Sequence, residues 1–578
     1  MQTEEEAQPT PRERWWTVGL IALIVVPLVV SAFYLWFSVG TSYKPNTDWA
    51  IFELRARDVF DHGVFVGAYS RFGWNHPGPL LFYVLAVPYK LMGSRSISMH
   101  ITALLVNGAT LVTIGWVAFR RGRLPMVVAV LVPVSLLTHA LGADLLRNPW
   151  NPYLPILPLL LLLLLCWSVA VGDLWMLPIA IGVASFAIQS HVGLSLVSVA
   201  FLGLSLLGIV TRGFRTDAVE RRVFWTRAAK VVAVSTGVFA VLWFPVFYGT
   251  VVRHDGNLDK LVRFFTSSHQ DTAGITKGFQ VLGLQWGPRP EWIIGPRGMG
   301  VIGNQTIDPE WWVAIGLVIG AAAAFVAYRR RSFDTLWLAG FLIFGMAVAI
   351  VSVSNVVDLL YPYLTRWTWV FGAPLGILLL RGLWLAPPTE RRTAVLRWAM
   401  PVSVVILAVL SAMETVDALN AGTPFAAEQG AEHVITREVL AHLPPGKGPV
   451  LIDTSRGGIV APGIALALER HGIPTEMVPR QVIVYGEDRT PKGGPYRAKL
   501  VPVLGDDAIH NFKPTGPRIA HYVKPQTAAD RRRIEGYFRA ARKLPAGPSR
   551  TAFLKLLKDG ANGPAVEIAV YLAEPKRP

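Results

Sequence analysis

Long apolar runs separated by clusters of arginine constrain this chain more than any other feature of its sequence. Several runs reach the roughly 18 apolar residues that a helix needs to cross a bilayer. The first, at 15–37, is followed by no small-residue cleavage site and is therefore predicted to be retained as a span. Of the 578 residues, 52% are hydrophobic and only 16% are charged, which is too apolar for a soluble protein. The chain is predicted to be an α-helical polytopic membrane protein.

The arginine clusters set the predicted orientation of the spans, because positive charge gathers in cytoplasmic loops. Four clusters, at 120–123, 212–230, 329–331 and 391–397, separate apolar runs. All four and the amino terminus lie on the cytoplasmic side if the chain has about eleven spans. The spans are predicted at 15–37, 97–119, 125–142, 153–171, 174–190, 192–211, 230–248, 311–328, 335–352, 367–385 and 397–416.

This topology places the first external loop at 38–96, a long external loop at 249–310 and everything after Val416 on the outer side. The apolar run 79–93 is too short to span a bilayer, and counting it as a span would place the 120–123 cluster outside. We therefore expect it to be interfacial or re-entrant.

The residues from 417 to the end have a different character from the transmembrane domain at 1–416. The stretch 448–479 reads as a buried strand, a loop with Gly457 and Gly458, a helix and a second strand. This order predicts a small extracytoplasmic α/β domain. The glycine pair is interpreted as a tight turn, since the fuller glycine pattern of nucleotide-binding folds is missing.

The net charge of +17 would suggest nucleic-acid binding in a soluble protein. Here the arginines sit between apolar runs, where they indicate membrane topology. No basic stretch is interleaved with aromatic residues as nucleic-acid binding requires, so no nucleic-acid partner is expected. The single cysteine, Cys166, excludes an intramolecular disulfide and a cysteine-based metal site.

A segment after the first span carries aromatic and charged residues at helical spacing. We expect a helix along the outer membrane interface with its aromatic side in lipid. The apolar face is Trp49, Phe52, Ala56, Val59 and Phe60, and the charged face is Glu53, Arg57 and Asp61. Asp48 at its start either caps the helix or presents a carboxylate at the boundary between water and lipid.

This segment and the corner that follows it resemble a known family. A first external loop that opens with an acid and runs through a helix to His-Pro-Gly-Pro-Leu at 76–80 resembles the membrane glycosyltransferases of the GT-C superfamily. These include protein O-mannosyltransferases, lipid A aminoarabinose transferases and mycobacterial arabinosyltransferases. Gly78 stands where the family has a second proline. The resemblance covers 15–416 in architecture and implies a GT-C-like fold in a bacterial plasma membrane.

The resemblance implies roles for particular residues. Asp48 matches the acid that is the proposed catalytic base in such enzymes. Trp49 follows it where the family has a second acid, so this acid is expected elsewhere, with Glu53 as the candidate. Asp144 matches an acid at the outer end of the third span. Arg366 in "YPYLTRWTW" matches an arginine that binds the lipid phosphate, a role that suits its planar fork.

Each assignment has a structural alternative. Asp144 and Arg147 are spaced for an ion pair, and Arg366 is equally consistent with an anchor at the membrane interface. Further polar residues on the same side are candidates for substrate binding. They are His76, Arg147, Asn148, Gln189 and His191.

The implied reaction is the inverting transfer of a sugar, arabinofuranosyl as the first choice and mannosyl as the second. The donor is a polyprenyl-phosphate sugar, the acceptor a cell-envelope glycan or glycoconjugate, and membrane lipid a further partner. The mechanism leaves room for a divalent cation, Mg²⁺, Mn²⁺ or Ca²⁺, at Asp48 or Asp144.

Two alternatives stay open. A lipid-linked oligosaccharide polymerase or O-antigen ligase agrees with the long external loop, but not with the acidic first loop and large carboxy-terminal domain. A non-enzymatic transporter or flippase of lipid-linked sugars would need charges at mid-membrane, whereas the charges here gather at the predicted outer face.

Overall fold

The computed structural model describes residues 10–267, 271–296, 311–357, 360–458, 460–524, 528–543, 550–551, 554 and 567–573. Parts of the expected 249–310 loop, at 268–270 and 297–310, therefore lie outside the described residues. The chain divides into two compact units. The first comprises Met1–Ser38, His100–Gly256 and Val262–Ala421, and the second comprises Val39–Met99, Asn257–Leu261 and Gly422–Pro578. The expected first external loop thus belongs to the same unit as the carboxy-terminal region.

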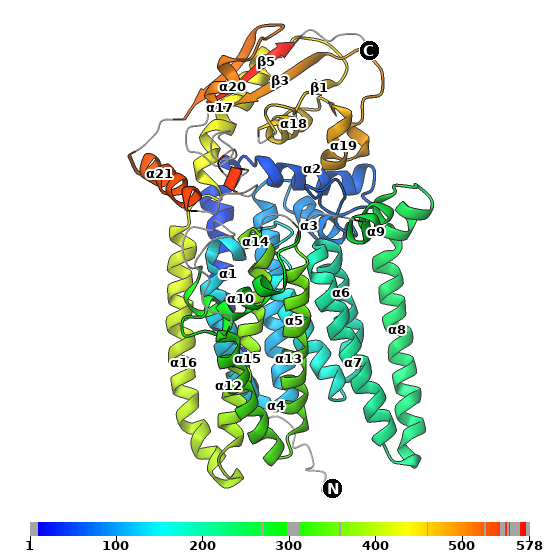
Figure 1. Cartoon of the computed structure of the whole chain (residues 1–578), viewed down its shortest axis with the longest axis vertical. Helices are drawn as coiled ribbons and strands as arrows, with labels where there is room; N and C mark the ends of the chain where they lie inside the picture. The colour runs from blue at the N-terminus through cyan, green and yellow to red at the C-terminus, as the bar shows by residue number, and fades with distance from the viewer. Residues whose placement is uncertain are drawn as a thin grey trace. The chain divides into compact units, whose positions relative to one another are not determined.

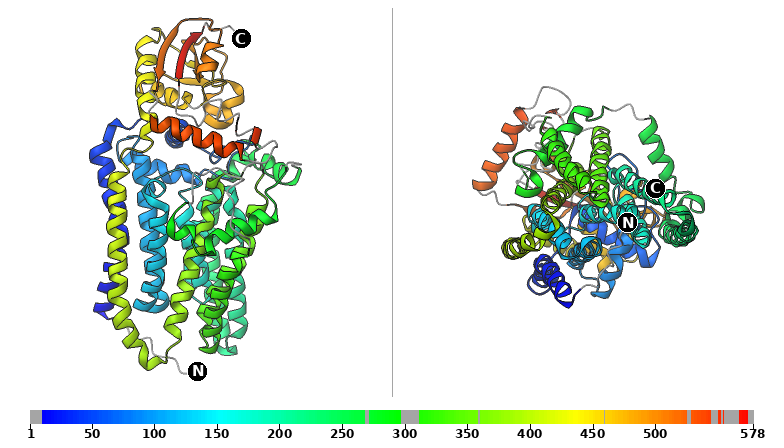
Figure 2. Two further views of the ribbon diagram at one scale, coloured as in Figure 1. Left: turned by 60° about the vertical axis from the view of Figure 1, so that its left-hand side comes forward. Right: turned by 90° about the horizontal axis from the view of Figure 1, so that it is seen from below.

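The first unit is a bundle of long helices that stand side by side (Figure 1, Figure 2). Helix α1 packs on α16, α5 on α7, and α12 on α15. The helices are α1 (Pro11–Tyr34), α4 (Ser98–Leu146), α5 (Ile156–Ala170), α6 (Leu177–Ser190), α7 (Ser195–Arg215), α8 (Ala218–Val251), α10 (Ile275–Trp286), α11 (Glu291–Ile294), α12 (Trp312–Arg329), α13 (Phe333–Ser354), α14 (Pro362–Thr365), α15 (Gly372–Leu385) and α16 (Thr389–Asn420). Short 3₁₀ turns η3 (Leu174–Met176), η4 (Val192–Leu194) and η5 (Arg366–Phe371) extend α6, α7 and α15.

Eight helical stretches within the described residues are long and apolar enough to cross a membrane. Every span expected from the sequence coincides with a helix, but the helices at 153–171 and 174–190 are shorter than that length. Two of them, 97–119 and 125–142, lie in the single long helix α4, which loses helical geometry at Gly122 and Arg123. The break falls in the arginine cluster, where Arg121 pairs with Asp334 at 2.6 Å. The chain is a polytopic helical membrane protein, as predicted.

The second unit combines a five-stranded sheet with helices. Its helices are α2 (Thr47–Asp61), α3 (Leu80–Leu91), the start of α9 (Asn257–Ser267), α17 (Ala426–His442), α18 (Ala461–Arg470), α19 (Val482–Tyr485), α20 (Asp506–His510) and α21 (Ala528–Arg542). Its strands are β1 (Val450–Ile452), β2 (Thr475–Met477), β3 (Ala498–Leu504), β4 (Arg518–Val523) and β5 (Glu567–Ala573), in the order β2-β1-β3-β5-β4.

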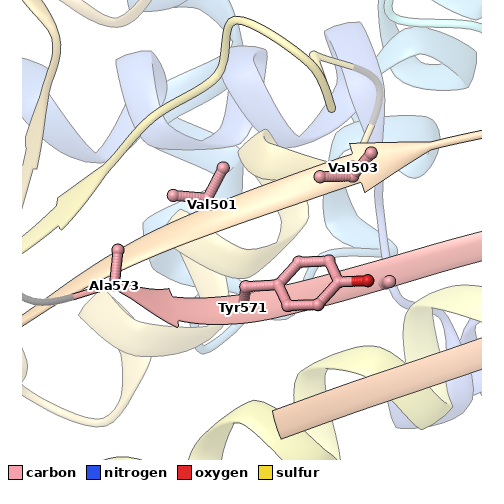
Figure 3. Packing of buried hydrophobic residues seen from close by; sticks show 5 residues of the cluster. Val501, Val503, Tyr571 and Ala573 are labelled. Atoms are coloured by element: carbon pink, nitrogen blue, oxygen red, sulfur yellow. The ribbon is translucent and has the colours of Figure 1, made fainter. Parts of the chain in front are cut away.

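The predicted strand–loop–helix–strand order is confirmed by β1, α18 and β2, since the two strands are parallel neighbours in the sheet. Strand β3 also runs parallel to β1, whereas β5 is antiparallel to β3 and to β4. An apolar cluster joins β3 and β5 (Figure 3). It consists of Val501, Val503, Ala569, Tyr571 and Ala573. The turn at Gly457 approaches Pro502 so closely that a Cβ there would lie 2.6 Å from its carbonyl oxygen.

Helix α2 forms where the pattern predicted, but part of its apolar face is covered by protein instead of lipid. Phe52 is 1% exposed and meets the ring of Phe82 on α3 edge to face, with centroids 5.5 Å apart. Helix α18 also packs on α2. The predicted lipid-facing orientation of Phe52 and Ala56 is therefore wrong, because an amphipathic pattern shows which face is apolar and not what covers it.

Candidate active site

Asp48 lies in the first turn of α2, but it does not cap the helix. The N-cap position is Asn46, and no side-chain capping hydrogen bond forms there. Thr47, directly before Asp48, has φ +43°. This region is unfavourable for a β-branched residue, and such strain persists only where the surroundings hold the backbone in place.

The carboxylate of Asp48 is oriented by a tyrosine from the loop after α2. The hydroxyl of Tyr69 donates a hydrogen bond to Oδ1 of Asp48 at 2.5 Å. Tyr485 lies close enough for the charge of Asp48 to act on it, and its pKa is raised chiefly by burial. Asp48 is thus a half-buried carboxylate beside phenols, an arrangement that can hold it in place to accept a proton.

Tyr69 and His76 belong to one small hairpin. Tyr69 and Asn75 form an antiparallel bridge, and the N–H of His76 donates to the carbonyl of Ala68 at 2.8 Å. The buried His76 ring meets the ring of Trp74 edge to face at 5.4 Å. The structure therefore places His76 on the hairpin strand opposite the one that carries Tyr69.

Asn75 and Asn257 fix this hairpin in place. The N–H of Asn75 donates to Oδ1 of Asn257 at 2.8 Å, and Nδ2 of Asn257 donates to the Asn75 carbonyl at 3.0 Å. Nδ2 of Asn75 also donates to the carbonyl of Ile483 at 3.1 Å. These two asparagines were not expected from the sequence, which gives no signal for a contact 182 residues apart.

Glu53, the candidate second acid, is fully buried and engaged within the second unit. Its Oε1 accepts hydrogen bonds from the hydroxyl of Tyr89 at 2.8 Å and from Nε of Arg470 at 3.0 Å. Arg470 also donates to the carbonyl of Ser94 at 2.9 Å. Glu53 therefore links α2 to α3 and α18, and this geometry favours a structural role over a substrate contact.

In the first unit, Asp144 lies just after Gly142, which interrupts α4 with φ +73°. Asp144 and Arg147 form the ion pair that the spacing suggested, with 2.5 Å between Oδ1 and Nη2. Arg147 is buried and also donates to the carbonyl of Ala421 at 3.0 Å, whereas the Asp144 side chain is 75% exposed. The arginine therefore anchors this end of α4, and its partner carboxylate faces outward.

Asp144 lines a cavity of about 850 Å³ within the first unit. His139 and Asp417 contribute further polar groups, and Oδ2 of Asp417 accepts the N–H of Ala143 at 2.8 Å. Glu414, one turn before Asp417, is buried and accepts the hydroxyl of Thr138 at 2.9 Å. Carboxylates at a cavity wall accept hydrogen bonds from sugar hydroxyls. Glu414 and Asp417 were not expected from the sequence.

Arg366 begins η5 and stacks on an indole ring. Its guanidinium carbon lies 4.1 Å from the Trp369 centroid, and the indole N–H donates to Oε2 of Glu291 at 3.0 Å. The Nε of Arg366 is buried and has no hydrogen-bond partner among the described residues. An unsatisfied buried donor is costly, so this guanidinium is suited to receive an anionic ligand.

The loop after Arg147 connects the remaining predicted residues of the first unit. Asn148 accepts the N–H of Trp150 at 3.0 Å, which closes a local turn. Nδ2 of Asn151 donates to the carbonyl of Ser190 at 3.1 Å. Tyr153 interacts electrostatically with Arg366. The loop thus follows the helix that carries Asp144 and contacts the end of α6 through Asn151 and Arg366 through Tyr153.

Gln189 and His191 lie in that α6–α7 turn and support it. Nε2 of Gln189 donates to the carbonyl of Leu242 on α8 at 3.0 Å, and Nδ1 of His191 accepts the N–H of Gly193 at 3.2 Å. Both side chains are buried. Their backbone contacts favour a structural role in the turn.

For the part of the chain that the structure describes, a divalent cation at Asp48 or Asp144 stays a prediction. No group of three or more His, Cys, Asp or Glu side chains there is arranged to hold a metal ion. Asp144 is paired with Arg147 and Asp48 with Tyr69.

No protein-family model matches the sequence, and no curated protein matches it. Two solved structures of ArnT from Cupriavidus metallidurans have a similar fold. One, bound to undecaprenyl phosphate, has 15% sequence identity and a TM-score of 0.50, and the match covers 96% of this chain and 99% of that one. The other, in the apo state, has 16% identity and the same coverage and TM-score. The chain therefore has a fold similar to that of these ArnT structures, which agrees with the fold that the motif resemblance predicted.

Proposed function

We propose that the protein is a membrane glycosyltransferase that moves a sugar from a polyprenyl-phosphate donor to a glycan or glycoconjugate of the cell envelope. The likeness of its fold to ArnT over almost the whole of both chains carries this proposal. One of those ArnT structures is bound to undecaprenyl phosphate, a polyprenyl phosphate of the kind proposed as leaving group here. The sugar is proposed to be arabinofuranosyl, with mannosyl as the second choice.

Asp48 is proposed as the general base. Its carboxylate takes the proton of the acceptor hydroxyl while that oxygen attacks the anomeric carbon of the donor. The new glycosidic bond forms on the face opposite the phosphate, and the bond between the anomeric carbon and the phosphate oxygen breaks. The configuration at the anomeric carbon is therefore inverted, and polyprenyl phosphate leaves with the bonding electron pair.

Arg366 is proposed to bind the phosphate of the donor. A guanidinium can pair with two phosphate oxygens at once and stays charged throughout the reaction. The stacking on Trp369 restricts its orientation, and its unsatisfied Nε supplies a donor for an anion. The phosphate accumulates negative charge as the bond breaks, so a fixed cation lowers the barrier.

The test is a screen of the purified protein against a panel of polyprenyl-phosphate sugars, with glycan acceptors and detection by mass spectrometry. The proposal expects one donor to be consumed, with equal amounts of glycosylated acceptor and polyprenyl phosphate formed. Loss of donor from one side of a proteoliposome without a covalent product would instead identify a transporter. An oligosaccharide transferred as a block would identify a ligase or polymerase.

A further inference from the structure

A second cavity lies within the second unit, between α17 and α18, whose residues supply most of its lining. Its volume is about 370 Å³, within the range of small-molecule sites. Lys44 and Ser96, from the segments before α2 and after α3, also line it. The proposed transfer reaction assigns no role to this cavity.

The charged side chains that line this cavity are mostly cationic. Lys44, Arg437 and Arg470 contribute positive charge. The exposed imidazoles of His433 and His471 donate to the backbone carbonyls of Ser42 and Ala467. Arg470 is neutralised by Glu53. Arg437 and Lys44 have no acidic partner among the described residues, and both are exposed. Two uncompensated cations in the lining favour an anionic ligand.

Glu432 is the one acid in the lining, and it is buried. Its side chain is 3% exposed, and Oε1 has no hydrogen-bond partner among the described residues. Burial raises the pKa of Glu432 to about 8, so the carboxyl is mostly protonated at neutral pH. It packs on Gly463, where a Cβ would lie 2.0 Å from Oε1.

A neutral carboxyl with an unused acceptor can exchange hydrogen bonds with a hydroxyl group. Leaving such a group unsatisfied costs free energy. Pro45, Leu440 and Leu466 supply apolar surface nearby. The lining therefore offers cations, a hydroxyl partner and an apolar wall, which are the features that a charged sugar ring requires.

We propose that the cavity between α17 and α18 binds a sugar unit that carries an anionic group, either a carboxylate or a phosphate. Arg437 and Lys44 pair with the anion, and Glu432 hydrogen-bonds a ring hydroxyl. The apolar side chains contact the C–H face of the ring. This binding needs no transfer reaction and is independent of the role proposed for Asp48.

The experiment measures binding to the full-length protein in an uncharged detergent by saturation-transfer NMR and calorimetry. The probes are glucuronate, glucose 1-phosphate, glucose and inorganic phosphate. We expect glucuronate and glucose 1-phosphate to bind at least about tenfold more tightly than the other two, because only they meet both halves of the site. The Asp48→Asn variant should bind both as the native protein does.

Arg437→Gln is expected to weaken glucuronate binding about tenfold. Arg437 is exposed, so this change leaves the fold intact, and Arg518→Gln on β4 serves as a matched exposed control without effect. Inorganic phosphate that binds as tightly as glucose 1-phosphate would overturn the sugar assignment. Equal effects of the two arginine variants, displacement of the sugars by a short-chain phosphatidylglycerol, or no binding of any probe would overturn the site.

Discussion

The hydroxyl of Tyr69 donates a 2.5 Å hydrogen bond to Oδ1 of Asp48. The bond joins the first turn of α2 to the hairpin that also carries His76. A general base must be held in one orientation to accept a proton efficiently. Tyr69 is therefore a positioning residue for Asp48, and it was not recognised from the sequence.

Tyr69→Phe should lower the transfer rate constant about tenfold while the KM for the donor stays nearly unchanged, because the phenol orients the base without binding the donor. The acid limb of the pH–rate profile should also move to higher pH, since the carboxylate loses a hydrogen bond to its charged form. Tyr328→Phe, at an exposed tyrosine, is the control. A lower thermal stability with an unchanged pH profile would indicate a structural role only.

The membrane spans could be predicted from the sequence because each depends only on the length of one continuous apolar run. Even the break between two spans inside α4 coincides with the arginine cluster at 120–123. The parallel β1–α18–β2 unit was predictable for the same reason, since strand, helix and strand follow one another directly.

The partners of the candidate site residues could not be predicted, because they come from distant parts of the chain. Glu53 and Arg470 are 417 residues apart in sequence, and no periodicity reports such a pair. The acidic residues at the end of α16 were overlooked for another reason. The helix continues to Asn420, beyond the point where its apolar run ends.

Glu53→Gln should destabilise the protein without removing its chemistry. Breaking a buried ion pair is costly, but Arg470 is partly exposed to water, so we expect a loss of about 2 kcal/mol. A thermal melt checks this, with Asp61→Asn at the exposed end of the same helix as the matched control. An equally stable variant that has lost transferase activity would restore Glu53 as the second acid.

Arg366→Lys separates phosphate binding from anchoring. Lysine keeps the charge and reaches the interface, but it lacks the bidentate fork. We expect polyprenyl phosphate to bind roughly tenfold more weakly, with unchanged insertion and melting temperature. Arg391→Lys, on the exposed start of α16, controls for a general loss of guanidinium. Unchanged affinity in the Arg366 variant would identify it as an anchor.

Glu432→Gln should stabilise the protein at alkaline pH. The pKa of Glu432 rises from 4.5 to about 8 on folding, so between these values the folded state binds more protons than the unfolded state. The contribution of Glu432 to the free energy of unfolding is therefore lost as pH rises from about 4.5 to 8, and it does not change further at higher pH. Melting temperatures measured from pH 5 to 9 should decline less in the variant than in the native protein.

The other titratable and charged groups that line the same cavity remain in both proteins. They are His433, His471, Lys44, Arg437 and Arg470. If the melting temperatures of the variant and the native protein declined in parallel with pH, Glu432 would not be a buried neutral carboxyl.

The central claim is that Asp48 is the base of a glycosyl transfer, and Asp48→Asn tests it most directly. The N-cap of α2 is Asn46, and an amide oxygen still accepts the hydrogen bond from Tyr69, so the fold should keep its melting temperature. An amide cannot take the acceptor proton, and losing a general base costs roughly 10²–10⁴-fold in rate. The measurement is the rate of glycosylated product formation by the purified variant and the native protein, with the donor identified in the panel. We expect a variant of native stability with a rate at least about a hundredfold lower. A variant that forms product at the native rate would contradict the account.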